Sequence, residues 1–301
     1  MAGKGRLTGL LLVIVGSISW GASGTIADYM FLTQHVPVLW VVGIRMFLAG
    51  ILLLLTYKIT VGGSIFTIWH DKSQASLLIC FAIFGMLMSQ FSYLSAVRFG
   101  NAATATVLQF TTPVFIIIYY SISRRKLPVR LDVISIVLAV VGTYLLATKG
   151  DFGSLTISKL GLFFGICAGI AGANCTLIPI KLLNKYDPRL VCGWAMLLGS
   201  LPIQPIVVID TPHININPTL IFELIFITIV GTMIAYLFYV ASLNYLEPAV
   251  TGTLSSFEPL TAAILSVSFL HLKLTLVEVI GGLLILMMAF VQALPQKNKL
   301  E

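Results

Sequence analysis

The sequence places one acidic and one basic side chain inside long apolar segments. Glu258 stands beside Pro259 in the stretch TLSSFEPLTAAI (253–264), and Arg45 stands in the apolar stretch GIRMF (43–47). A charged side chain at the centre of a bilayer costs about 2.5 kcal/mol or more, so such residues mark pathways for solutes or ions, or pair with other groups of the protein. Both residues are therefore candidates for binding a solute or for coupling its movement to a proton.

Glu258 belongs to a polar strip on its segment. Helical spacing puts Thr251, Ser255 and Glu258 on one face. Pro259 lacks an N–H group and crowds the carbonyl four residues earlier, so we expect the carbonyl oxygen of Ser255 to be free. Two interpretations of Glu258 remain open: it binds a proton or cation during transport, or it only caps or hydrogen-bonds a neighbouring helix.

Other candidates are polar and aromatic residues that recur at helical spacing or at similar depth within the apolar segments. They are Trp20, Gln90, Tyr93, Gln109, Thr112, Asn174, Tyr236 and Tyr239. An apolar pocket with a few polar groups is typical of a small-molecule site, and we expect at least two of these residues to line one. The alternative for each is packing of the helices. For Arg45 the alternative is pairing with a carboxylate or with carbonyls of the bundle.

The composition excludes a soluble protein. Of the 301 residues 58% are hydrophobic and only 10% are charged, whereas soluble domains carry about 25% charged residues. The net charge of +7 does not come from a basic patch, so no nucleic-acid partner is expected. The cysteines show no ligand spacing and are expected to be small buried thiols; neither a metal nor a cofactor is predicted.

Apolar runs near the ~20 residues needed to cross a bilayer recur along the chain. The sequence predicts an all-α integral membrane protein with ten transmembrane helices, at 7–29, 37–57, 74–98, 102–121, 131–148, 159–183, 189–209, 219–245, 250–270 and 274–294. An even number places both termini on one side. Only Arg98, Lys149, Lys159 and Lys273 then fall on the opposite side, so both termini are predicted to be cytoplasmic.

The chain contains an internal duplication. GMLMSQFSYLSAV (85–97) aligns with GTMIAYLFYVASL (231–243), and VLQFTTPVF (107–115) aligns with TLSSFEPLT (253–261), without a gap. Two units are predicted, at 1–150 and 151–301, in which Pro259 matches Pro113 and Glu258 matches Thr112. Because each unit has an odd number of helices, the two are inverted in the membrane, as in many secondary transporters.

Glycines at small-residue spacing predict close helix packing. Gly161, Gly165, Gly169 and Gly172 recur along the sixth expected helix, so another helix can approach it closely. Gly281 and Gly282 in the last expected helix could serve packing or a homodimer interface, and the sequence leaves that choice open.

Several short motifs give the chain a family resemblance. Ser19-Trp-Gly21, Gly43-Ile-Arg-Met-Phe47, Ser256-Phe-Glu-Pro259 and Gly281-Gly-Leu-Leu-Ile285 resemble those of the drug/metabolite transporter superfamily, EamA-domain type. The resemblance covers the whole chain as two EamA-like units. It implies helices one, three, four, six, eight and nine around a central cavity, and small organic solutes that are often moved outward.

One departure from the family pattern concerns a loop acid. Similar proteins often carry Gly-Glu at the end of the fourth helix of each unit, where this chain has Arg124-Arg125 and His271-Leu272. A role for such a loop carboxylate is therefore in doubt here.

These features predict a secondary transporter in the cell inner (cytoplasmic) membrane that moves an amino acid, metabolite or drug-like compound by alternating access, with efflux favoured. Uptake of a cationic or zwitterionic nutrient is the alternative. The expected partners are the solute, the lipid bilayer and, if transport is coupled, a proton. From other classes, the rivals are a channel and an intramembrane serine hydrolase. Gly21-Ala-Ser-Gly24 matches a serine-nucleophile motif, but no histidine base stands within a span, so no enzyme is predicted.

Overall fold

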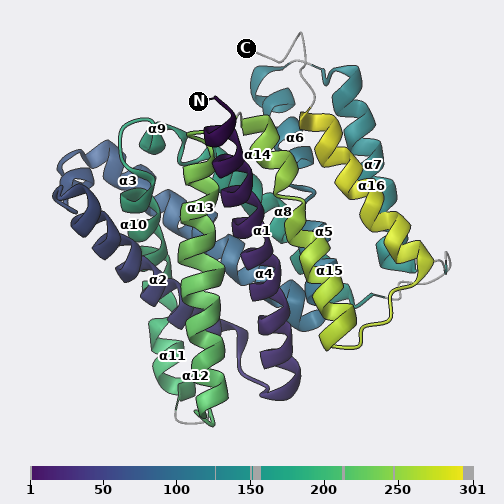
Figure 1. Cartoon of the computed structure of the whole chain (residues 1–301), viewed down its shortest axis with the longest axis horizontal. Helices are drawn as coiled ribbons and strands as arrows, with labels where there is room; N and C mark the ends of the chain where they lie inside the picture. Colours follow the sequence, from purple (N-terminus) through teal and green to yellow (C-terminus); the bar gives the residue numbers. More distant parts are fainter. Residues whose placement is uncertain are drawn as a thin grey trace.

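A computed structural model of the protein describes residues 2–125, 127–149, 151, 157–211, 214–246 and 248–293. These residues form helices and turns and contain no strand (Figure 1). The elements up to residue 149 are α1 (Ala2–Thr33), α2 (Val38–Val61), the 3-10 helix η1 (Thr67–His70), α3 (Lys72–Cys80), the π-helix η2 (Phe81–Leu87), α4 (Met88–Phe99), α5 (Ala102–Gln109), α6 (Thr112–Arg124) and α7 (Arg130–Thr148). The later elements are α8 (Lys159–Leu177), α9 (Ile180–Leu183), α10 (Pro188–Ser200), the 3-10 helix η3 (Leu201–Ile203), α11 (Gln204–Asp210), α12 (Pro218–Ile225), the π-helix η5 (Phe226–Ile234), α13 (Ala235–Ser242), α14 (Pro248–Leu254), α15 (Phe257–Phe269) and α16 (Leu276–Ala293).

Helical segments of membrane-spanning length account for most of the described chain. Eight are long and apolar enough to cross a bilayer: Arg6–Thr33, Val38–Val61, Lys72–Phe99, Ala102–Ser123, Arg130–Thr148, Lys159–Leu183, Pro188–Asp210 and Pro218–Ser242. The expected span 250–270 is divided between α14 and α15. The expected span 274–294 corresponds to α16, whose apolar part, Leu276–Val291, is shorter. Glu247, in the expected turn before α14, and Leu294 lie outside the described residues.

Both prolines of the duplicated motif follow a break in a helix. α5 ends at Gln109 and α6 begins at Thr112, just before Pro113; α14 ends at Leu254 and α15 begins at Phe257, two residues before Pro259. A helix cannot continue regularly into proline because the ring displaces the carbonyl four residues earlier. The expectation that the Ser255 carbonyl oxygen is free was wrong, since the tight turn brings the Glu258 N–H to it at 2.9 Å.

The two π-helices also occupy corresponding places. η2 and η5 lie in or directly before the aligned stretches of the duplication, and in η5 the Thr232 hydroxyl donates to the Ile227 carbonyl five residues earlier at 2.7 Å. Such widened turns are rare and occur frequently at functional sites because they redirect side chains. Both π-helices lead directly into helices that carry candidate residues, α4 and α13.

The two halves of the chain pack mainly against each other. α7 lies along α16 at one flank, α2 lies along α10 at the other, and α4 packs on α8. Near the centre of Figure 1, α1 packs on α13, η5 and α15. The main hydrophobic core accordingly mixes residues of both halves, including Trp40, Leu94, Ala168 and Ile227. The halves therefore form one body rather than two lobes.

Two glycines allow other helices to pack closely at Glu258 and at its aligned residue Thr112. Gly21 of α1 lies against the backbone carbonyl of Glu258, and Gly172 of α8 lies against the side chain of Thr112, the residue aligned with Glu258. A β-carbon at either glycine would clash with these atoms. The predicted close approach along α8 is confirmed, and Glu258 is held where two helix backbones meet.

Candidate functional site

A cavity of about 590 Å³ lies between the two halves of the molecule. Its walls come from α1, α2, η2, α4, α5, α6, α8, α10, η5, α13, α14, α15 and α16, and from the breaks before Pro113 and Pro259. Pockets that hold small organic molecules have volumes of about 300–1,000 Å³. The cavity is therefore of suitable size for a metabolite.

The structure brings most of the predicted residues to this cavity. Those that line it are Trp20, Arg45, Gln90, Tyr93, Gln109, Thr112, Tyr236, Tyr239, Ser255 and Glu258. Asn174 is not among the lining residues: its side-chain amide donates to the Phe84 carbonyl oxygen at 3.0 Å and joins α8 to η2. Its place in the fold is thus between two helices rather than in the cavity wall.

Glu258 is half-buried, and it lines the cavity next to Ser255. Within the described part of the chain, its carboxyl group has no hydrogen-bond donor and no ion pair within 4.0 Å. The Ser255 hydroxyl donates to the Gly252 carbonyl oxygen at 2.6 Å. Thr251 of the predicted polar strip is buried and faces Ser242 at 3.5 Å instead. Glu258 is therefore an acid with both oxygens available to a ligand.

Arg45 reaches the cavity from α2 and is only 5% exposed. Its Nε donates to Thr232 Oγ1 at 2.6 Å, and its Nη2 donates to the Gly231 carbonyl oxygen at 3.3 Å. The guanidinium is thus fixed by a hydroxyl and a carbonyl rather than by a carboxylate. The resemblance left the second helix out of the cavity wall, but the length of the arginine side chain brings its charge to the cavity.

The tyrosines and the tryptophan form the aromatic part of the wall. Tyr93 OH lies 3.1 Å from Thr106 Oγ1, and the Thr106 hydroxyl donates to the Ala102 carbonyl, so the tyrosine is the donor between them. The Tyr236 hydroxyl accepts from Cys192 Sγ at 2.9 Å. Trp20 and Tyr239 pack with ring centroids 5.3 Å apart. These contacts hold the rings rigidly, as recognition of a ligand requires.

Polar groups of the first half complete the wall. The Thr112 hydroxyl lies 2.8 Å from the Gln109 carbonyl oxygen and 3.0 Å from that of Gly169 on α8. Among the described residues, the side-chain amides of Gln90 and Gln109 have no hydrogen-bond partner, although both line the cavity. They can therefore donate to or accept from a bound molecule.

Some lining residues were not predicted from the sequence. Met86 and Thr232 also face the cavity, one helical turn before Gln90 and Tyr236 respectively. Both could have been predicted by going back four residues from Gln90 and from Tyr236, because residues four apart share a helix face. Ser23, the serine of the nucleophile-like motif, also lines the cavity. Its Oγ has no hydrogen-bond partner among the described residues, so no base contacts it.

A buried acid of α1 was also missed. Asp28 is 3% exposed, and its Oδ2 accepts from the Ala102 N–H at 2.9 Å, at the first residue of α5. A carboxylate at this position satisfies a free N–H group and complements the positive end of the helix dipole. We assign Asp28 to the anchoring of α5.

The cavity extends toward the end of the molecule where α1 begins. Thr176 on α8 and Ala289 on α16 lie toward that end of their helices and line the cavity. Figure 1 shows the start of α1, the start of α14 and the end of α16 at this same end. At the opposite end of the cavity, Tyr93 and Arg45 are held by hydrogen bonds.

The cysteines are less buried than expected. All four are free thiols, but only Cys192 is buried; Cys167 and Cys175 are half-buried and Cys80 is exposed. The reason is visible for two of them, because Cys175 faces the central cavity and Cys80 faces a surface hollow.

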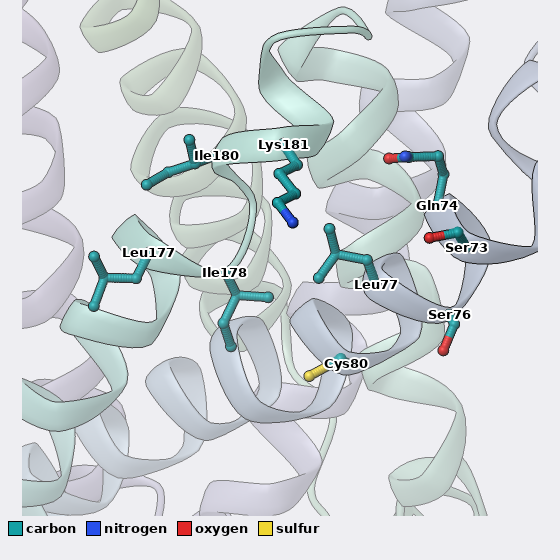
Figure 2. A pocket seen from close by; sticks show the side chains of 9 residues that line it. All are labelled: Ser73, Gln74, Ser76, Leu77, Cys80, Leu177, Ile178, Ile180 and Lys181. Atoms are coloured by element: carbon teal, nitrogen blue, oxygen red, sulfur yellow. The ribbon is translucent and has the colours of Figure 1, made fainter. Parts of the chain in front are cut away.

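That surface hollow, of about 670 Å³, lies between α3 and the end of α8 (Figure 2). Figure 2 shows Lys181, Leu77 and Ile178 around it. It adjoins the cavity along α8, where Thr176 lines the cavity and Leu177 lines the hollow. Its lining carries one cation and no acid, so the central cavity is the stronger candidate site.

Comparisons with known proteins found a matching family model, relatives of similar sequence and a solved structure of similar fold. The model of the EamA-like transporter family matches residues 7–148 and again 159–292. The chain is 32% identical over 291 residues to the uncharacterized inner membrane transporter YicL of Salmonella typhimurium, covering 97% of each chain. It is 25% identical to the uncharacterized transporter YwfM of Bacillus subtilis, covering 96% of this chain and 95% of the other. A solved structure titled "Crystal structure of protein" superposes with a TM-score of 0.62 at 14% identity, covering 96% of both chains.

Proposed function

Because the chain belongs to the EamA-like transporter family, we propose that it is a secondary transporter that moves a small organic solute across the cytoplasmic membrane by alternating access. The family match over both halves and the apolar helical segments support a membrane transporter. The solute class, the direction and the coupling are parts of the proposal.

The central cavity carries this proposal. It lies between the halves, it is of metabolite size, and it holds two charged side chains that do not pair with each other. In many secondary transporters the site lies at the interface of two structural repeats, near the middle of the membrane. A site at this interface is exposed to one side or the other when the halves rock.

We assign the ten expected spans to two inverted units, 1–150 and 151–301, with both termini in the cytoplasm. The paired breaks before Pro113 and Pro259 and the matching π-helices support this assignment. The cavity reaches toward the end at which α1 begins. With both termini assigned to the cytoplasm, this supports an inward-facing conformation. To complete the transport cycle, the cavity would close at the end near α14 and α6 and open at the opposite end of the molecule.

Glu258 is the residue to which we assign coupling. Its carboxyl group faces the cavity without a donor or cation in contact, so it can hold a proton or a solute ammonium group in turn. Competition between the two at one carboxylate would drive solute outward as protons enter. Efflux is thus the direction that we propose.

The test is flux in proteoliposomes. A thermal-shift screen with the purified protein first selects solutes, and their flux is then measured with and without a pH gradient. Saturable flux that responds to the gradient is the expected result. Non-saturable flux, as fast as diffusion through a pore, would contradict a carrier. Flux that is the same with and without the pH gradient would contradict proton coupling.

A further inference from the structure

One nitrogen of the Arg45 guanidinium has no hydrogen-bond partner among the described residues. Nε and Nη2 bind Thr232 and Gly231, but Nη1 is buried and has no hydrogen-bond partner. Among the described residues no carboxylate lies within 4.0 Å of it. A buried charge without a counter-charge is strongly destabilising unless a partner binds it. The cavity therefore contains a cation that is only partly satisfied.

A second unused donor lies beside it. The Ser23 hydroxyl is 2% exposed, lines the same cavity, and has no partner among the described residues. Ser23 packs against Gly231, whose carbonyl Arg45 binds. Two unpaired buried donors, one of them cationic, thus converge on one part of the wall. Such a pair is suited to a carboxylate, because Nη1 and the Ser23 hydroxyl can each donate a hydrogen bond to it and the bond from the cationic guanidinium is charge-assisted.

The opposite charge faces the same cavity at a distance. Glu258 interacts electrostatically with Arg45, but the two do not form an ion pair. Trp20 and Tyr239 line the cavity as well, and their ring faces attract cations. The cavity therefore presents a cationic pole and a separate acidic pole beside aromatic rings.

The second half of the chain lacks the equivalent cation. VGIRM (42–46) aligns with CGWAM (192–196), which places Ala195 opposite Arg45, and the established alignment places Met86 opposite Thr232. Ala195 is fully buried and Met86 lines the cavity. The fold thus tolerates an apolar pair at this position, which argues that the Arg45–Thr232 pair serves a ligand.

We propose that Arg45 and Ser23 bind the carboxylate of the transported solute, and that this solute is a zwitterion whose ammonium group is held by Glu258. The inference rests on the proposed transport function and specifies the chemistry of its site. It makes Arg45 a specificity-determining residue that distinguishes a free carboxylate from an uncharged group in the same place.

Matched probes test this directly. Leucine and phenylalanine are compared with leucinamide and phenylalaninamide, which keep the side chain and the amine but lack the carboxylate. Binding to the purified full chain is measured by calorimetry. The wild type should prefer at least one zwitterion over its carboxamide by about 10- to 100-fold, the usual value of a hydrogen bond to a charged group. Arg45→Gln should lower the affinity for the zwitterion far more than that for the carboxamide, so that the preference is lost.

The control is Arg98→Gln, because Arg98 also donates to a carbonyl oxygen, that of Phe31, but does not line the cavity. The Arg98→Gln protein should keep the preference for the zwitterion over the carboxamide. Ser23→Ala, which removes one hydroxyl, should reduce the preference about 3- to 10-fold and gives a readout if Arg45→Gln does not fold.

Several results would overturn the inference. An Arg45→Gln protein that loses affinity for both probes equally would make Arg45 a packing residue. A wild type that binds zwitterion and carboxamide alike, or binds no zwitterion of the set, would exclude a carboxylate site. None of these results would contradict the proposed transport function. That function is contradicted if proteoliposomes show no saturable flux of any solute selected by the thermal-shift screen.

Discussion

Arg45 and Glu258 line the same cavity and attract one another, yet no pair of their charged atoms comes within 4.0 Å. Opposite charges in a protein interior gain most by direct contact. Here Arg45 is held back by Thr232 and Gly231, and Glu258 is held by the turn before Pro259. The separation leaves space between them for a solute.

Glu258→Gln should abolish or uncouple transport while the protein stays folded. Glutamine has nearly the same volume and can keep polar contacts, but it cannot exchange a proton or hold an ammonium group by charge. We expect flux in the presence of a pH gradient to fall to the level seen without a gradient, with an unchanged melting temperature. Glu278→Gln is the matched control, because Glu278 pairs with Lys149 at 2.9 Å outside the central cavity. Wild-type, pH-dependent flux in Glu258→Gln would exclude the role assigned here.

Gly21→Ala should shift Glu258 and weaken transport. The added β-carbon would clash with the backbone carbonyl of Glu258 and with Thr261, so α1 and α15 must separate. Overpacking of this kind costs about 1–3 kcal/mol, which should appear as a lower melting temperature together with reduced flux. Gly282→Ala is the control, because the nearest atom to its added carbon lies at 3.9 Å. Equal melting temperatures and equal flux in the two variants would show that the close packing of α1 on α15 at Gly21 is not needed for transport.

Cys175 should be accessible to water-soluble thiol reagents through the cavity. It lines the cavity on the side that extends toward the start of α1, whereas Cys192 is 2% exposed and donates to Tyr236. In single-cysteine variants, a charged methanethiosulfonate should modify Cys175 faster than Cys192, and a bound solute should slow the reaction. Equal rates with and without solute would place the solute elsewhere.

The start of α10 should lose stability in acid. Asp187 caps this helix and binds Arg189 through both carboxylate oxygens, at 2.8 and 2.7 Å. The hydrogen bond from Arg189 holds the pKa of Asp187 below its usual 3.8. A lowered folded-state pKa gives stability that is present above the unfolded pKa and is lost as the pH falls through the folded one.

Melting temperatures of the wild type and Asp187→Ala in detergent should therefore converge as the pH falls below about 4. Near pH 7 the free energies of unfolding of the two proteins should differ by the usual cost of losing a helix cap, about 1 kcal/mol, so the melting temperature of Asp187→Ala should be the lower one. Asp71→Asn is the comparison, because Asp71 caps α3 by accepting from the Ser73 and Gln74 N–H groups and the oxygen of an asparagine side chain can still accept them. A difference between wild type and Asp187→Ala that persists unchanged at pH 3 would contradict this account.

Much of the site could be predicted from the sequence because the cavity wall follows helical periodicity. Gln90 with Tyr93, and Tyr236 with Tyr239, were predicted from helical spacing. Glu258 was predicted because a charged side chain in an apolar segment has a high free-energy cost. Asn174 could not be placed, because spacing gives the face of a helix but not which neighbour covers it. Thr232 was missed although it lies four residues before Tyr236 and lines the same cavity, because the prediction did not extend beyond the pairs of polar and aromatic residues. Asp28 was missed because its partner, the N–H of Ala102 at the start of α5, belongs to the backbone of another helix.

Counterflow tests the central claim most directly. Proteoliposomes are loaded with unlabelled solute at high concentration and diluted into a trace of the labelled solute. A carrier that alternates its access exchanges one for the other, so the labelled solute should accumulate transiently above its external concentration. A monotonic approach to equilibrium, or no entry at all, would contradict alternating access through the cavity between Arg45 and Glu258.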